Sequence, residues 1–195
     1  MNFKNLIFSY VNILSNELDK KKFFSFLRKI FNFNYKLFLN LIRKCLSKNY
    51  INLDKIGKEE LYDYSLDELF LYFNCDKGSS FRVNKGKKIT SHNYSLFYEK
   101  YLKSLKNEKM RVLEIGSHEG KGLAAFYFFL PNTKFLGANI NPFQMRYSSK
   151  RIDEVYIDVS SKKIVENFES YFAEEFDIII DDASHNLRDI LITLP

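Results

Sequence analysis

The feature that most constrains this chain of 195 residues is a short segment near its middle, Met-Arg-Val-Leu-Glu-Ile-Gly-Ser-His-Glu-Gly-Lys-Gly, residues 110 to 122. Its apolar run from Arg111 to Ile115 predicts a buried strand. Glycines follow at positions 116, 120 and 122, and the apolar pattern of residues 123 to 130 predicts a helix. In such a turn the backbone can approach a ligand closely, and the helix N-terminus offers unpaired N–H groups. A nucleotide-like ligand suits this arrangement.

The carboxylate of Glu114 narrows the choice of ligand, because an acid at this place repels a pyrophosphate and attracts an ammonium group or a ribose hydroxyl. Glu-x-Gly-x-x-x-Gly after a strand resembles motif I of the class I methyltransferases that use S-adenosylmethionine. The resemblance implies that Glu114, Gly116, Ser117 and Gly120 bind this donor. The competing dinucleotide fingerprint requires a glycine where this chain has His118, so a nicotinamide-binding oxidoreductase is disfavoured.

The second half of the chain alternates predicted strands with helices. Strands are expected at residues 134 to 138, 155 to 157 and 176 to 181, with a helix at 163 to 172. This alternation predicts an α/β fold, a Rossmann-like parallel sheet of about four strands with helices on both faces. Ligands bind outside the carboxyl ends of such strands. The polar residues at those ends are Glu114, Asn139, Asp158 and the run 181 to 185.

That last run, Asp-Asp-Ala-Ser-His, resembles the Asp-Asp-Gly-Ser-His motif of the macrocin and cephalosporin-type metal-dependent O-methyltransferases. Two upstream pieces, Asp-Lys-Gly at 76 to 78 and His-x-Tyr at 92 to 94, resemble the segment before motif I in the same family, a loop that helps to close over the donor. The resemblance implies that Asp182 binds a magnesium-like ion and that His185 is the general base. The other interpretation is that Asp181 and Asp182 cap the following helix and that His185 lies on the surface.

The same resemblance gives roles to the remaining strand ends. Asp181 belongs to the expected donor site, and Asp158 would face the adenine. Asn139 stands where these enzymes usually carry an acid that grips the two ribose hydroxyls. Asparagine can accept one of those hydrogen bonds but lacks the charge that strengthens the pair.

The N-terminal region differs in composition from the rest. Residues 1 to 50 hold ten Lys and Arg against two Asp and Glu, whereas the whole chain carries +6. Its apolar residues recur at helical spacing, and Lys22, Lys29, Lys36 and Arg43 recur every seventh position. The pattern predicts a basic α-helical region, residues 1 to 74, before a partial methyltransferase domain at 75 to 195. The lysine-rich face is either solvated, on a hairpin packed against the domain, or in peripheral contact with anionic lipid.

Two local signals lie between these parts. Ser65 and Glu68 form a capping-box pattern that opens a short helix, and a second helix is expected to start at Ser91. The polar segment from residue 75 to 91 is the best candidate for a linker. Cys45 and Cys75 fit no zinc or redox spacing, which indicates a cytoplasmic protein. Because the basic excess lies outside the catalytic part, nucleic acid is not expected to bind.

The resemblance covers residues 75 to 195 and omits the last third of the family's fold. A truncated chain of this kind would leave the Ile-rich fourth strand at an open edge, where an oligomer or another partner could cover it. The sequence therefore predicts an S-adenosylmethionine-dependent O-methyltransferase, assisted by magnesium and acting on a sugar, natural-product or glycan hydroxyl. The alternative is a catalytically silent remnant that serves as an interaction module.

Overall fold

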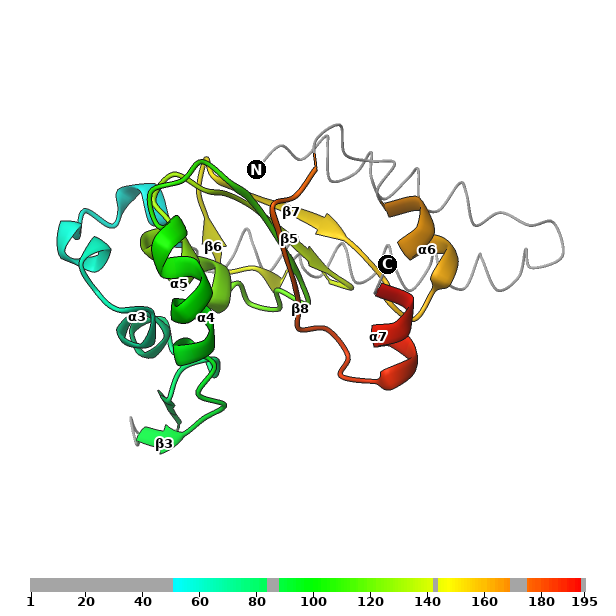
Figure 1. Ribbon diagram of the computed structural model, residues 1–195, viewed down its shortest axis with the longest axis horizontal. Helices are drawn as coiled ribbons and strands as arrows, with labels where there is room; N and C mark the ends of the chain where they lie inside the picture. The colour runs from blue at the N-terminus through cyan, green and yellow to red at the C-terminus, as the bar shows by residue number, and fades with distance from the viewer. Residues whose placement is uncertain (1–50, 84–87, 142–143, 169–174, 194–195) are drawn as a thin grey trace, which may run out of the picture.

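A four-stranded parallel sheet forms the centre of the protein (Figure 1). The computed structural model describes residues 51–83, 88–141, 144–168 and 175–193. The strands are β4 (Arg111–Ile115), β5 (Lys134–Asn139), β7 (Ile152–Tyr156) and β8 (Ile178–Asp181), in the spatial order β7-β5-β4-β8. Winding therefore reverses between β4 and β8. The predicted Rossmann-like α/β fold is confirmed.

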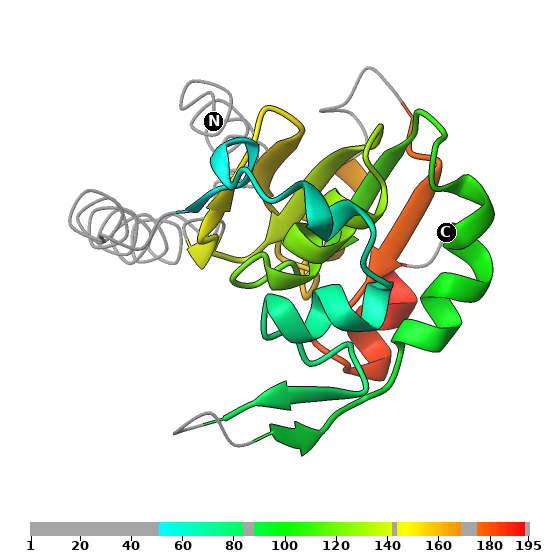
Figure 2. The ribbon, with the colours of Figure 1, turned by 90° about the vertical axis from the view of Figure 1, so that its left-hand side faces the viewer.

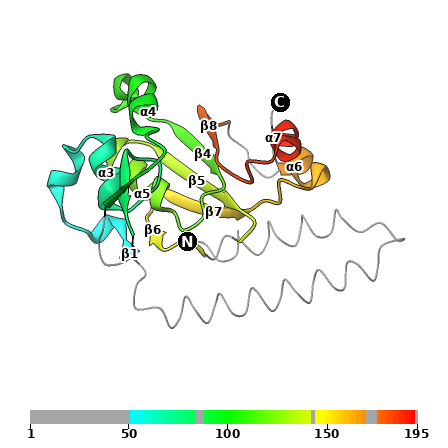
Figure 3. The same ribbon diagram turned by 90° about the horizontal axis from the view of Figure 1, so that it is seen from below.

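Helices cover both faces of the sheet. Side chains alternate along β4, so Val112 packs into one hydrophobic cluster and Leu113 into the other. The first face is covered by α5 (Lys121–Phe129) and the second by α6 (Lys162–Phe168), which contacts α7 (Leu187–Thr193). Figure 3 shows α5 and α6 on opposite sides of the sheet.

Residues 51 to 74 pack on the first face. The segment contains β1 (Ile51–Asn52), the 3-10 turns η2 (Leu53–Lys55) and η3 (Glu59–Tyr62), and α3 (Leu66–Tyr72). β1 pairs with β6 (Tyr147–Ser148). The predicted capping box of Ser65 and Glu68 is confirmed at the start of α3. Because Phe70 of α3 packs edge-on against Phe126 of α5, with ring centres 5.5 Å apart, this segment shares the core of the α/β part.

The expected linker at 75 to 91 is wrong, because this segment contains a β-hairpin. β2 (Ser80–Arg82) pairs antiparallel with β3 (Lys88–Thr90), and the hairpin extends from the rest of the fold (Figure 2). These strands are short and carry no long apolar alternation, so hydrophobic periodicity did not detect them. The next helix, α4 (Ser95–Leu102), begins four residues after the expected Ser91 and leads into η5 (Lys103–Leu105).

Other predicted boundaries are close to the observed ones. The helix expected at 123 to 130 spans 121 to 129, and the strand expected at 155 to 157 begins earlier, at Ile152. Part of the helix expected at 163 to 172, and the whole basic segment of residues 1 to 50, lie outside the described residues. The boundary at residues 74 and 75 stays a prediction. Among the helices in the described ranges, none has the length and apolar character needed to cross a membrane.

Candidate functional site

The turn after β4 is shaped by its glycines. Gly116 and Gly120 have φ values of 88° and 78°, in the left-handed region where glycine is favoured. A Cβ atom on Gly116 would overlap the backbone carbonyl of Asp182, so the missing side chain lets the end of β8 lie against the turn. At Gly120 a Cβ atom would overlap the sulfur of Met145. These two glycines therefore allow close contacts within the protein itself.

A cavity of about 670 Å³ opens at the carboxyl ends of the four parallel strands. This is the edge at which the fold predicts a ligand, and the volume is typical of small-molecule sites. Six of the residues predicted from sequence line it, with at least one from each strand end: Gly116, Ser117, Asn139, Asp158, Asp182 and His185. Parallel pairing of the strands brings these residues together, although they are distant in sequence: Gly116 and His185 are 69 positions apart.

Three other predicted donor-site residues do not line this cavity. Gly120 lies against Met145. Asp181 accepts hydrogen bonds from the Ala183 amide, at 3.1 Å, and from the Thr193 hydroxyl, so it holds the start and end of the following segment together. Glu114 is only 1% exposed and lies beneath the cavity, where a Cβ atom on Gly122 would come within 2.8 Å of its Oε1.

The buried Glu114 carboxylate has an ion-pair partner that sequence reasoning did not single out. Lys77 Nζ lies 3.1 Å from Glu114 Oε1, and the Lys77 side chain is 7% exposed. Hydrogen-bond geometry is not met: within the described part of the chain, neither Glu114 oxygen accepts a hydrogen bond. The attraction is therefore one of charge, in a place where a carboxylate without a counter-ion would be costly.

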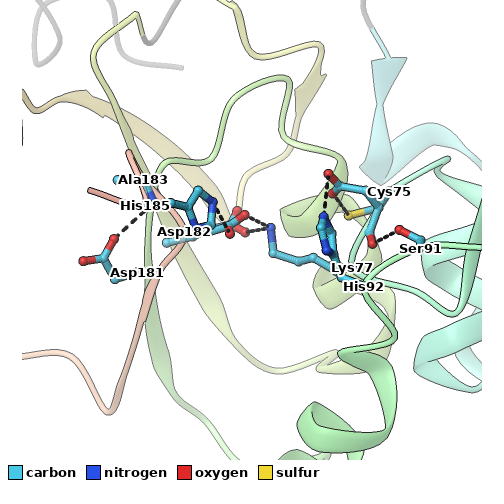
Figure 4. A network of polar contacts seen from close by, with 10 residues as sticks. Cys75, Lys77, Ser91, His92, Asp181, Asp182, Ala183 and His185 are labelled. Carbon is cyan, nitrogen blue, oxygen red and sulfur yellow. Dashed lines mark hydrogen bonds and ion pairs between the residues drawn. The ribbon is translucent and has the colours of Figure 1, made fainter. Parts of the chain in front are cut away.

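The same ammonium group also contacts the end of β8. Lys77 Nζ donates to Asp182 Oδ2 at 2.5 Å, and Figure 4 shows the lysine pointing at that carboxylate. Burial of Lys77 by itself lowers its pKa, but the charges of Glu114 and Asp182 outweigh this effect and raise the pKa above its ordinary value. Lys77 is therefore a cation throughout the physiological pH range.

His185 lies on the other side of Asp182, at the mouth of the cavity. Its Nε2 is 3.5 Å from Asp182 Oδ1, and Figure 4 shows the imidazole beside that carboxylate. The His185 side chain is 72% exposed, against 25% for Asp182. His185 has φ 55°, which is rare for a residue with a side chain and often marks functional sites. A histidine next to a carboxylate and open to a cavity can accept a proton from a bound hydroxyl.

The Lys77 backbone is held by the segment that contains the His-x-Tyr sequence. The amides of His92, Asn93 and Tyr94 donate to the carbonyls of Asp76, Gly78 and Lys77 at 3.2, 2.8 and 2.8 Å. Behind this contact, the Asp67 carboxylate accepts from Ser79 N at 2.6 Å and from Ser95 Oγ at 2.7 Å. The loop is thus fixed from two sides. The His92 side chain is exposed and does not line the cavity.

The two strand ends on the far side of β4 present polar groups of their own. Asp158 Oδ1 accepts from Ser160 N at 3.0 Å and from Ser160 Oγ at 2.6 Å, which fixes the turn after β7. The Asn139 amide nitrogen donates to the carbonyls of His118 and Asn141 at 3.5 and 3.4 Å. Its Oδ1 is therefore the atom left to accept a hydrogen bond from a ligand hydroxyl.

A divalent ion does not fit the described residues around Asp182. Hard cations prefer several oxygen ligands, but the lysine already occupies Asp182 Oδ2. Asp181 is bonded to Ala183 and Thr193, and the carboxylate of Asp189 accepts from Ser184 Oγ at 2.7 Å. In the ranges that the structure covers, no three or more His, Cys, Asp or Glu side chains gather in a way that could hold a metal ion. The predicted metal role of Asp182 stays a prediction.

Sequence reasoning missed five charged residues of the cavity wall, and two of them, Lys77 and Asp189, are buried. Lys77 was noticed only as part of a loop, since a lysine in a polar segment normally lies in water. Its burial depends on contacts with residues 37 and 105 positions away in the sequence, Glu114 and Asp182. Asp189 is buried on α7, a helix whose existence the sequence indicated only through the capping residues before it.

No protein-family model matches the sequence, and no curated protein matches it. Among solved structures, the MycE methyltransferase from the mycinamycin biosynthetic pathway, in complex with Mg and SAH, is 22% identical with a TM-score of 0.47 over 67% of this chain and 31% of that one. A second MycE structure, with Mg, SAH and mycinamycin VI, is 26% identical with a TM-score of 0.41 over 51% of this chain and 28% of that one. The chain thus spans less than a third of these proteins.

Proposed function

We propose that this chain binds S-adenosylmethionine and takes part in transfer of its methyl group to a hydroxyl group of a sugar, natural product or glycan. One observation carries the proposal: six of the nine residues that the methyltransferase resemblance implies, from all four strand ends, line a single cavity. The cavity lies where winding reverses between β4 and β8, the usual ligand position in open α/β sheets.

Each wall of the cavity has its own part in this proposal. The donor occupies the side formed by the turn after β4 and the ends of β5 and β7, where Asn139 accepts from a ribose hydroxyl and Asp158 faces the adenine. The acceptor occupies the side formed by the end of β8, where His185 is exposed to the cavity. The acceptor oxygen bonds to the methyl carbon of the donor as the bond from that carbon to the sulfonium sulfur breaks, so S-adenosylhomocysteine leaves. His185 takes the proton that the acceptor hydroxyl loses.

Donor binding is the first test. S-adenosylmethionine and S-adenosylhomocysteine are titrated into the full chain by calorimetry, and we expect one binding site for each. Asn139→Ala and Asp158→Asn should each weaken binding by about tenfold, the effect of one lost hydrogen bond of about 1.4 kcal/mol. Asp153→Asn changes an exposed residue of β7 outside the cavity wall, so it is the matched control and should bind like the wild type. No heat with either ligand would refute the proposal.

Methyl transfer is the second test. Release of S-adenosylhomocysteine is followed with a panel of sugars and glycosides that carry free hydroxyls. His185→Ala should lower the rate by about 100-fold or more, the usual contribution of a general base. His92→Ala changes another exposed histidine that lies outside the cavity wall, so it should leave the rate unchanged. Equal losses in the two variants would remove His185 from the reaction.

Magnesium receives no step in this proposal. The resemblance implies a magnesium-assisted reaction, but Lys77 is bonded to Asp182, and among the described residues no three His, Cys, Asp or Glu side chains gather to hold an ion. In this proposal Asp182 instead pairs with Lys77 and lies beside His185.

A second candidate function is a silent interaction module, and one observation favours it. Within the described residues β8 pairs only with β4, and Ile179 is 61% exposed on that open strand. Leu187 and Leu191 of α7 are also largely exposed. A chain of this kind would bind a partner, such as a second copy, through β8 and would give no heat with the methyl donor.

A further inference from the structure

Four charged or ionisable side chains form a continuous series from the core to the cavity mouth. In order they are Glu114, Lys77, Asp182 and His185, and the atoms that join them are 3.1, 2.5 and 3.5 Å apart. Side-chain exposure rises along the series, from 1% to 7%, 25% and 72%. The series connects β4 to the end of β8 at the point where the sheet reverses its winding.

The position of Lys77 in this series is built by the fold. Three backbone hydrogen bonds from residues 92 to 94 fix residues 76 to 78, so the lysine enters the site from a braced loop. A buried ammonium is costly unless it is paired, and here two carboxylates from different strands pair with it. Removal of Lys77 would leave the two carboxyl groups of Glu114 and Asp182 without their shared cation at the switch point.

An ammonium group and a divalent ion compete for the same partners, because both bind carboxylate oxygens. The Asp182 carboxylate lines the cavity and would be open to an ion if the lysine were absent. Among the described residues, no three His, Cys, Asp or Glu side chains gather around Asp182, so an ion there would need water for most of its ligands. The lysine balances the charge without a ligand from solvent.

We propose that the Lys77 ammonium is the resident cation of this site. It holds the place at Asp182 that a divalent ion would otherwise take, and it acts as a positioning residue that keeps Asp182 beside His185. The site is therefore independent of divalent metal. The inference rests on the proposed function only for the part that His185 plays toward an acceptor; the cation at Asp182 can be tested without donor or acceptor.

The test uses Mn²⁺ alone as the probe, titrated into the full chain and followed by electron paramagnetic resonance. The wild type should show no Mn²⁺ bound through Asp182, so its titration should equal that of Asp182→Asn. Its melting temperature should be the same in Mg²⁺ and in a chelator. Mn²⁺ binding by the wild type that Asp182→Asn abolishes would overturn the proposal, whatever the result of the donor titration.

The variants Lys77→Met and Lys77→Arg form the matched pair. Lys77→Met keeps the length of the side chain and removes its charge. It should gain Mn²⁺ binding at Asp182 that is at least ~10-fold tighter than the background binding of Asp182→Asn, because a neighbouring positive charge no longer opposes the ion. Mg²⁺ should also raise its melting temperature. Lys77→Arg keeps the charge and should behave like the wild type. If packing and not charge were responsible, Lys77→Arg would not restore the wild-type behaviour.

A failure of Lys77→Met to gain Mn²⁺ binding would contradict the proposal. If this variant loses folded protein, Lys77→Met/Glu114→Gln replaces it, since that pair leaves no unpaired charge in the core and still frees Asp182. A smaller gain is expected there, because only the Asp182 carboxylate remains to attract the ion, and the absence of any gain has the same meaning. Neither measurement depends on methyl transfer, so a metal-independent site that binds no methyl donor would reject the proposed function alone.

Discussion

The two faces of the central sheet are covered to different extents. On the first face, α3 and α5 pack over the sheet with a large cluster that includes Phe70, Phe126 and Phe128, and the cluster reaches Ile180 of β8. On the second face, a smaller cluster under α6 covers β4, β5 and β7 but not β8, where Ile179 is 61% exposed. The first face thus buries the larger hydrophobic cluster, and the second leaves β8 exposed beside the candidate acceptor side.

Aromatic side chains explain the difference. Phe126 packs edge-on against Phe70 and Tyr98, with ring centres 5.5 and 5.3 Å apart, and Phe73 stacks on Phe128 at 5.7 Å. Such ring pairs add stability beyond the apolar area that they bury. The cluster of the second face has one buried ring, Phe168 of α6, and the rings of Tyr156 and Phe176 are only partly buried against it. The face with the rings is also the one that holds Glu114 and Lys77, so the buried charges lie in the better-packed half.

The largest effect that separates the faces should come from Phe126→Ala. Phe126 is fully buried, so the variant loses apolar burial and leaves a cavity, at a cost of about 3–5 kcal/mol. Leu191→Ala on α7, where leucine is 63% exposed, should change the free energy of unfolding by less than about 0.5 kcal/mol. Urea unfolding measures both. Similar losses would mean that the two faces contribute equally.

The next effect concerns the turn that joins the faces at the cavity. Gly116→Ala places a Cβ atom on the Asp182 carbonyl in addition to the strain of a positive φ, so it should cost more than about 2 kcal/mol. Gly57→Ala is the matched control: its φ is 61°, and the nearest atom to the added carbon is 4.0 Å away. Only the strain of about 1 kcal/mol is expected there. If the two variants lowered the free energy of unfolding equally, the end of β8 would have to move away from the added Cβ atom at no cost.

A smaller effect should appear in alkali. Burial raises the pKa of Cys75, on the first face, from 9.0 to about 12. The unfolded chain therefore releases this proton above about pH 9 while the folded chain keeps it, and stability must fall as pH rises. The loss should reach about 1.4 kcal/mol at pH 10, measured by urea unfolding.

Cys75→Ala provides the control for this pH dependence, because it removes the titrating thiol and should flatten part of the decline. The remaining decline has the same sign, since burial also raises the pKa values of Tyr98 and Tyr127 to about 12. An increase in stability between pH 9 and 10 would contradict the buried state of these groups.

The strands and helices of the α/β half could be predicted because their signals are local. The apolar run before Gly116 and the alternation of later segments determine both element type and the edge where ligands bind. The positions of Asn139, Asp158 and His185 around one cavity follow from that rule. Boundaries differed by a few residues, as they do when element ends depend on capping and tertiary contacts.

The charge series could not be predicted, because its partners are distant in sequence. Glu114 was expected to attract a ligand ammonium group, and the structure instead supplies Lys77 from the protein. The glycines of the turn were expected to make room for the donor, yet Gly116, Gly120 and Gly122 each make room for another part of the chain. A local pattern shows that space is needed but does not show which atoms fill it.

The smallest effect on stability should come from the open part of the second face, with Ile179→Lys. Because Ile179 is 61% exposed, the free energy of unfolding should change by less than about 0.5 kcal/mol, whereas association through the open edge of β8 should weaken, since a lysine on an edge strand opposes pairing. Sedimentation velocity over a concentration series measures that association.

Leu96→Lys is the control, because Leu96 is 69% exposed on α4, away from the second face, and should leave association unchanged. If Ile179→Lys lowered the free energy of unfolding by more than about 1 kcal/mol, Ile179 would have to be buried in the single chain. The second face would then be covered like the first, and the difference between the two faces would not hold.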